Sequence, residues 1–277
     1  MANIFLSLAL FISILLSVYL YIYLLEKAPP SPRLLSSIFI LCDISLEASG
    51  TAFIISRNCL LSSYHNIATN PKNPTKSHKK KWKIVTGLER LRNGTICTLG
   101  GSFPIQVTVH KYCVREDWVI LKRDNGLFDE DQVIPICPVA EIPVYGEEPN
   151  VRIYQCALDL FNGGFIDAIR PTSLTVKMGY CTNHKVFLQA GLFGGSSGAV
   201  YVIADPMHRG FGKAFGMHCE SINTSKTVED VMNEGEIVDP DAVIEEVTDS
   251  CVNSHASFVQ GILISTYKNL MGKIMFP

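Results

Sequence analysis

A serine in a glycine-rich turn is the first feature of this sequence that could carry out chemistry. Ser197 lies in the run Gly-Gly-Ser-Ser-Gly at residues 194–198, and the apolar residues 199–203 follow directly. Glycines let the backbone turn sharply and let a substrate carbonyl approach the N–H groups. Such a run usually forms a flexible loop, but here it opens a segment typical of a buried strand. A serine held at that position is well placed to act as a nucleophile.

Two further segments offer the base and the orienting group that a serine nucleophile needs. His65 ends an apolar run that begins at residue 60, and Asp117 opens the apolar residues 118–122. A lone histidine is more often structural, and a lone aspartate is often a turn or cap residue. An aspartate at the start of a strand can also accept a hydrogen bond from an imidazole and fix its tautomer.

In chain order, the three segments resemble the chymotrypsin-like (trypsin-like) serine proteases. That family places Thr-Ala-Ala-His, then Asp-Ile-Ala-Leu-Leu, then Gly-Asp-Ser-Gly-Gly. This chain has Ser-Ser-Tyr-His65, Asp117-Trp-Val-Ile-Leu and Gly195-Ser-Ser197-Gly198, and the resemblance covers residues 36–220. It implies that His65 is the general base, Asp117 its orienting group and Ser197 the nucleophile, with the N–H groups of Gly195 and Ser197 as the oxyanion hole. It implies no cofactor and no metal.

Departures from the family pattern bear on how the expected enzyme is activated and on which substrates it prefers. Digestive members have an aspartate directly before the nucleophile, which pairs with a new N-terminus freed by cleavage. Here that residue is Ser196, and no Ile-Val-Gly-Gly type sequence occurs near the N-terminus. We therefore expect an enzyme without this zymogen switch. Trypsin has an aspartate six residues before the serine, and Gly191 at that position does not support a preference for Lys or Arg.

The segment Phe-Gly-Met-His at residues 215–218 bears on specificity. In the family, this strand lines the pocket for the residue before the scissile bond. Picornaviral main proteases and several glutamate-specific relatives carry Gly-x-His there. The resemblance implies that Gly191, Gly216 and His218 contact the substrate, with His218 donating to a Gln or Glu side chain. The alternative is a structural histidine at a strand end.

The segments around these residues predict an all-β domain. Short apolar runs are separated by Gly, Pro, Asn or Asp, as in barrels or sandwiches. The resemblance implies two six-stranded antiparallel β-barrels, at residues 36–128 and 150–220, within a protease domain at 36–277. Apolar residues at near-helical spacing predict a final amphipathic helix in the tail at 256–272. The predicted strands are residues 37–42, 51–56, 83–86, 105–110, 118–122, 151–158, 173–178, 185–189, 199–203 and 213–218.

The N-terminus predicts a membrane anchor. Residues 4–25 contain no charged side chain, and a bilayer core needs ~20 apolar residues in a helix. The start lacks basic residues and no clear cleavage site follows, which favours an uncleaved transmembrane helix at residues 1–25 over a signal peptide. Residues 26–35 form a short linker. Lys27 and Arg33 follow the span and no side-chain charge precedes it, which favours a cytosolic protease domain.

The amino-acid composition argues against several other classes of protein. Hydrophobic residues make up 47% and charged residues 18%, which argues against general disorder. A net charge of −2 gives no sign of a nucleic-acid partner. The 9 cysteines are odd in number and form no C-x-x-C pair, so we expect no zinc site and mostly buried free thiols.

The leading hypothesis from the sequence is a membrane-anchored serine endopeptidase that acts on polypeptides and contacts lipid through its N-terminal helix. Two alternatives stay open. One is an inactive protease-fold module that holds a peptide in its groove. The other is a membrane-tethered β-barrel interaction module in which the three motifs coincide by chance. The oligomeric state does not follow from the sequence.

Overall fold

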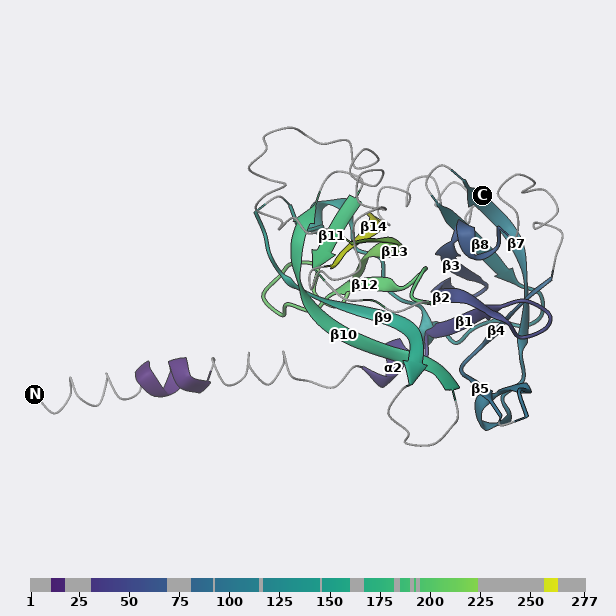
Figure 1. The fold of residues 1–277 in the computed structure, drawn as a ribbon. Coiled ribbons are helices and arrows are strands. Elements are labelled where there is room, and N and C mark those ends of the chain that lie inside the picture. Colours follow the sequence, from purple (N-terminus) through teal and green to yellow (C-terminus); the bar gives the residue numbers. More distant parts are fainter. Residues whose placement is uncertain are drawn as a thin grey trace, which may run out of the picture.

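The structure of the chain is a computed structural model. It describes residues 11–17, 31–68, 81–91, 93–114, 117–144, 146–159, 167–181, 185–189, 192, 195–223 and 257–263. Strands dominate these ranges, which confirms the prediction of a mostly β protein (Figure 1). Besides the helical residues 11–17, the short helical elements are α2 (Pro32–Leu35), η1 (Tyr64–Asn66), η2 (Leu99–Gly101), η3 (Glu130–Gln132) and η4 (Val139–Glu141).

Part of the predicted membrane anchor lies within the described ranges. Residues 11–17 are helical and exposed, whereas the rest of residues 4–25 lies outside them. Across the described part of the chain, no helix has the length and apolar character needed to span a bilayer. The anchor therefore stays a prediction.

Six antiparallel strands from the first half of the chain close into a barrel, in the order β1-β2-β3-β8-β7-β4 (Figure 1). Every residue of β1 and β3 is buried, because one face of each strand packs inside the barrel and the other faces the second sheet. Large apolar side chains such as Trp82 and Leu121 fill the interior. The strands are β1 (Ile38–Cys42), β2 (Ala48–Ser56), β3 (Cys59–Ser63), β4 (Trp82–Val85), β7 (Ile105–Cys113) and β8 (Trp118–Arg123).

The second half of the chain forms most of an eight-stranded sheet in the order β11-β14-β13-β12-β9-β10-β5-β6. An additional pairing of β10 with β11 brings the strands from β9 to β14 around a second apolar core. The hairpin of β5 and β6 comes from the first half of the chain and extends this sheet at β10. The strands are β5 (Leu88–Arg90), β6 (Ile96–Thr98), β9 (Asn150–Asp159), β10 (Asp167–Cys181), β11 (Lys185–Gln189), β12 (Val200–Ile203), β13 (Ala214–Asn223) and β14 (Ser257–Leu263).

The predicted C-terminal helix is wrong for the part of the tail that the structure describes. Residues 257–263 form β14, which lies between β13 and β11 and pairs with both. The physical reason is that two strand edges need backbone partners, and a strand inserted there supplies them where a helix could not. Residues 264–272 of the predicted helix lie outside the described ranges.

The two sheets share a core, and the candidate site lies where they meet. Ile40 and Phe53 from the first barrel belong to the same buried cluster as Tyr154, Val200 and Met217 from the second sheet. Apolar contact across this junction holds both sheets in one arrangement. Side chains at the rim of the junction can therefore be aligned to within hydrogen-bonding distance.

Candidate active site

His65 lies in a short helical turn that directly follows a buried strand. β3 ends at Ser63, and η1 carries Tyr64, His65 and Asn66. Tyr64 and Asn66 are buried, whereas the His65 side chain is 46% exposed. The turn thus anchors its two outer residues in the protein and presents the imidazole at the surface.

Asp117 binds His65 through both carboxylate oxygens. The His65 ring Nδ1 lies 2.7 Å from Asp117 Oδ2, and the His65 backbone N–H donates to Oδ1 at 2.9 Å. The Tyr64 N–H also donates to the Asp117 carbonyl. Asp117 has a positive φ of 49°, a conformation that aspartate tolerates better than most residues. These contacts fix the orientation of the ring and direct the proton of neutral His65 to Nδ1, which leaves Nε2 able to accept a proton.

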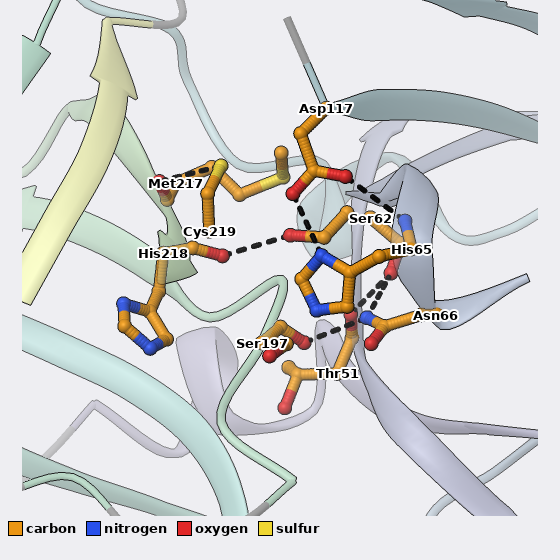
Figure 2. A network of polar contacts seen from close by, with 10 residues as sticks. Thr51, Ser62, His65, Asn66, Asp117, Ser197, Met217, His218 and Cys219 are labelled. Carbon is orange, nitrogen blue, oxygen red and sulfur yellow. Dashed lines mark hydrogen bonds and ion pairs between the residues drawn. The ribbon is translucent and has the colours of Figure 1, made fainter. Parts of the chain in front are cut away.

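Ser197 lies in the turn that precedes β12. Its carbonyl accepts hydrogen bonds from the Thr51 N–H at 2.8 Å and from Asn66 Nδ2 at 2.9 Å. Asn66 is the residue after His65, so these bonds bring the serine turn next to the histidine turn. Figure 2 shows the His65 ring between the Asp117 carboxylate and Ser197. Within the described residues, the Ser197 hydroxyl makes no hydrogen bond to His65.

The glycines on either side of the serine turn adopt conformations that other residues rarely take. Gly195 has φ +93° and Gly198 has φ +88°. A Cβ on Gly198 would lie 2.0 Å from the Thr51 carbonyl oxygen, so only glycine fits there. The turn is therefore a tightly packed structure in contact with β2, rather than the flexible loop that such sequences usually form.

Ser196, which stands where digestive relatives carry aspartate, is 3% exposed. An unpaired carboxylate buried to this extent would be costly, whereas a hydroxyl is accommodated by ordinary hydrogen bonds. Next to the turn, burial raises the pKa of the Cys156 thiol to about 12. Cys156 is thus protonated at neutral pH and is a poor nucleophile.

His218 lies on β13 and is 2% exposed. The Tyr201 hydroxyl lies 3.0 Å from His218 Nδ1, and the His218 carbonyl accepts from the Gly198 N–H and from the Ser63 hydroxyl. Burial raises the pKa of Tyr201 well above its ordinary value, so the phenol stays protonated and able to donate. Figure 2 shows the His218 ring directed away from His65.

The other residues predicted for the substrate pocket differ in how far the structure describes them. Gly216 lies on β13 and pairs with Tyr201 on β12 and with Leu263 on β14. Gly191 lies outside the described residues. Seven cysteines whose side chains the structure describes form no disulfide, in keeping with the expected thiols, and four of them are buried.

Sequence reasoning missed three residues that contact the site, namely Thr51, Asn66 and Tyr201. Thr51 and Asn66 bind the serine turn, and Tyr201 binds His218. The adjacency of Asn66 to His65 was the one available signal for Asn66. Thr51 and Tyr201 lie within ordinary apolar strands, so no local pattern marks them.

Comparison with protein-family models finds no match to this chain, and a search of the curated proteins finds none either.

Proposed function

We propose that this chain is a serine endopeptidase that hydrolyses peptide bonds with His65, Asp117 and Ser197. The observation that carries the proposal is the contact of 2.7 Å between His65 Nδ1 and Asp117 Oδ2, beside the turn that holds Ser197. The order of the three motifs along the chain supports the same assignment. A carboxylate that fixes an imidazole next to a serine is the arrangement that activates the hydroxyl.

In the proposed reaction, His65 Nε2 removes the proton from the Ser197 hydroxyl as its oxygen attacks the substrate carbonyl. The N–H groups of Gly195 and Ser197 stabilise the negative charge that develops on that carbonyl oxygen. The C–N bond then breaks, and His65 gives its proton to the leaving amine. Water, deprotonated by His65, hydrolyses the resulting ester on Ser197 and restores the free enzyme.

For specificity, we propose that His218 selects Gln or Glu before the scissile bond. The support is the contact between the Tyr201 hydroxyl and His218 Nδ1. If the phenol donates to Nδ1, the imidazole proton lies on Nε2. Nε2 is then a donor that can bind the side-chain oxygen of Gln or Glu. A peptide library should accordingly be cleaved after these residues, and cleavage after aromatic or basic residues would contradict this specificity.

A second candidate is an inactive protease-fold module that binds peptides without cleaving them. One observation favours it, namely that the Ser197 hydroxyl makes no hydrogen bond to His65 in the described part of the chain. Catalytic hydrogen bonds are often long before substrate binds, so this geometry is also compatible with an enzyme.

A fluorophosphonate probe, which reacts covalently with activated serines, separates the two candidates. We expect it to label the full-length protein, and we expect Ser197→Ala to abolish the label. Ser49→Ala is a matched control, because Ser49 lies on β2 with its hydroxyl bonded to the Leu41 carbonyl. Absence of labelling in the wild type would favour the binding module, and equal labelling of Ser197→Ala would exclude Ser197 as the nucleophile.

We also propose that residues 1–25 anchor the protein in a membrane, on the support of the uncharged stretch at 4–25. The full-length protein should then stay in the membrane fraction after an alkaline carbonate wash, and a variant lacking residues 1–30 should be released. Release of the full-length protein would contradict the anchor.

A further inference from the structure

Thr51 binds both ends of the segment that carries the candidate nucleophile. Its backbone N–H donates to the Ser197 carbonyl at 2.8 Å, and its hydroxyl donates to the Gly195 carbonyl at 2.9 Å. One residue of β2 thus holds the carbonyls on either side of Ser196. Thr51 is fully buried, so its own N–H and hydroxyl groups are shielded from water.

The hydroxyl of Thr51 has no freedom to rotate away from Gly195. It has a single proton, and the Cys156 N–H donates to the same oxygen at 3.0 Å. Because the Cys156 N–H occupies one lone pair of the Thr51 hydroxyl oxygen, the single hydroxyl proton is directed to the Gly195 carbonyl. The Ser62 hydroxyl also donates to the Thr51 carbonyl at 2.7 Å, which holds Thr51 itself in place.

The bonds of Thr51 complete a set that orients three successive peptide groups. The carbonyls of Gly195 and Ser197 bind Thr51, and the Ser196 carbonyl accepts from the Ala199 N–H at 2.8 Å. In a trans peptide the N–H points opposite to the carbonyl, so fixing the Ser196 carbonyl also directs the Ser197 N–H. Two of the bonds to these three carbonyls come from side chains and can be removed by substitution, namely the Asn66 amide bond to Ser197 and the Thr51 hydroxyl bond to Gly195.

We propose that the Thr51 hydroxyl is a positioning group for the oxyanion hole and the Ser197 nucleophile. This inference rests on the proposed peptidase function. Thr51 does not touch the substrate, but its bond to the Gly195 carbonyl prevents rotation of the peptide between Gly195 and Ser196, which lies between the two proposed donors, the N–H groups of Gly195 and Ser197. Oxyanion donors stabilise the transition state only when they are already aimed at the developing charge, so the loss of this bond lowers the rate of the chemical step.

The test compares Thr51→Val, which keeps the shape but removes the hydroxyl, with Thr51→Ser, which keeps the hydroxyl. In the full-length enzyme, we expect Thr51→Val to lower kcat by ~10- to 100-fold and to change KM by less than ~2-fold. Its affinity for a peptide boronate, which mimics the tetrahedral intermediate, should fall by a similar factor. Thr51→Ser should stay within ~3-fold of the wild type in all three constants.

Thr108→Val is the matched control, because the Thr108 hydroxyl binds Asp124 in the first barrel, away from the site. It should keep the wild-type kcat. If Thr51→Val does not fold, as judged by circular dichroism, Thr51→Cys replaces it, since its thiol fills similar space but donates weakly. Thr51→Cys should then show the same loss of kcat.

Two results obtained with an active wild-type enzyme would overturn the inference. One is an active wild-type enzyme in which Thr51→Val keeps the full kcat and boronate affinity, and this result leaves the proposed function intact. The other is equal impairment of Thr51→Ser and Thr51→Val, which would mean that the hydroxyl is not the relevant group. A wild-type chain that neither cleaves peptides nor reacts with the fluorophosphonate overturns the proposed function together with the role of Thr51.

Discussion

The side-chain amide of Asn66 donates a hydrogen bond of 2.9 Å to the backbone carbonyl of Ser197, although the two residues are 131 positions apart in the sequence. The same nitrogen also contacts the Ser62 hydroxyl at 3.1 Å. Gly50 leaves the necessary space, because a Cβ there would lie 2.2 Å from Asn66 Nδ2. A buried amide next to His65 thus ties the segment of the proposed base to that of the proposed nucleophile.

Removal of this amide should weaken both the fold and the activity. We expect Asn66→Ala to lower the free energy of unfolding by ~1–2 kcal/mol, because it removes a buried amide and leaves the part-buried Ser197 carbonyl with one partner fewer. Chemical denaturation measures the loss. Asn58→Ala is the control, since Asn58 is only half-buried and binds Ser56 in a hairpin away from the site. An Asn66→Ala protein as stable as Asn58→Ala would contradict the prediction.

Asp117→Asn tests the contact with His65. The substitution keeps the shape but replaces a carboxylate that binds both the His65 ring and the His65 backbone N–H. We expect kcat to fall by ~10³- to 10⁴-fold, because the amide favours the wrong imidazole tautomer. Asp124→Asn, which alters the carboxylate that binds Thr108, should keep its activity. Comparable rates for Asp117→Asn and the wild type would rule out Asp117 as the orienting group.

Gly198→Ala should be far more damaging than a substitution at another glycine with positive φ. Gly198 and Gly212 have φ of +88° and +75°, but only Gly198 has backbone atoms close to the position of a new Cβ. We expect Gly198→Ala to lower the free energy of unfolding by more than about 3 kcal/mol, and Gly212→Ala to lower it by about 1 kcal/mol. Thermal unfolding of both variants measures the difference, and equal melting temperatures would show that steric contact is not the limiting factor.

Tyr201→Phe tests the proposal that Tyr201 orients His218 for substrate selection. The substitution removes the hydroxyl that contacts His218 Nδ1 and leaves the aromatic ring in the core. We expect preference for Gln or Glu over other residues to decrease by ~10-fold, because the proton of His218 is no longer directed to Nε2. Tyr112→Phe, at an exposed position, is the control. Unchanged selectivity in a peptide library would argue against the role of His218.

Ionisation of Glu147 should make the stability of the folded protein depend on pH in the acidic range. The Val144 N–H, His208 and Arg209 bind its carboxylate and hold its pKa below the ordinary value of 4.5. A depressed pKa stabilises the folded state above the unfolded-state pKa, and this contribution is lost as pH falls through the folded-state pKa.

Glu147→Gln should therefore melt at a lower temperature than the wild type at pH 6, and the gap should close as the pH falls below 4.5. Thermal unfolding across this range measures the effect, with Glu148→Gln at the exposed neighbouring residue as the control. A gap between wild type and Glu147→Gln that does not change with pH would show that ionisation of Glu147 is not linked to folding.

Local patterns in the sequence determined most strands and several features of the site. Short runs of apolar and β-branched residues predicted β1, β2, β9 and β11, because the residues that fill a buried strand are recognisable without their partners. The glycines around Ser197 predicted a sharp turn, because glycine lets the backbone turn where other residues cannot.

Only the tertiary structure decided which segments meet. The apolar residues of 257–263 are compatible with a helix or a strand. They form a strand because the edges of β11 and β13 pair with their backbone. The hairpin of β5 and β6 joins the second sheet rather than the barrel beside it in sequence. Hydrogen bonds such as those of Asn66 and Thr51 to the serine turn join residues far apart in the chain, so no local pattern encodes them. The sequence thus determined which residues offer chemistry, and packing between the two sheets decided which of them come within bonding distance.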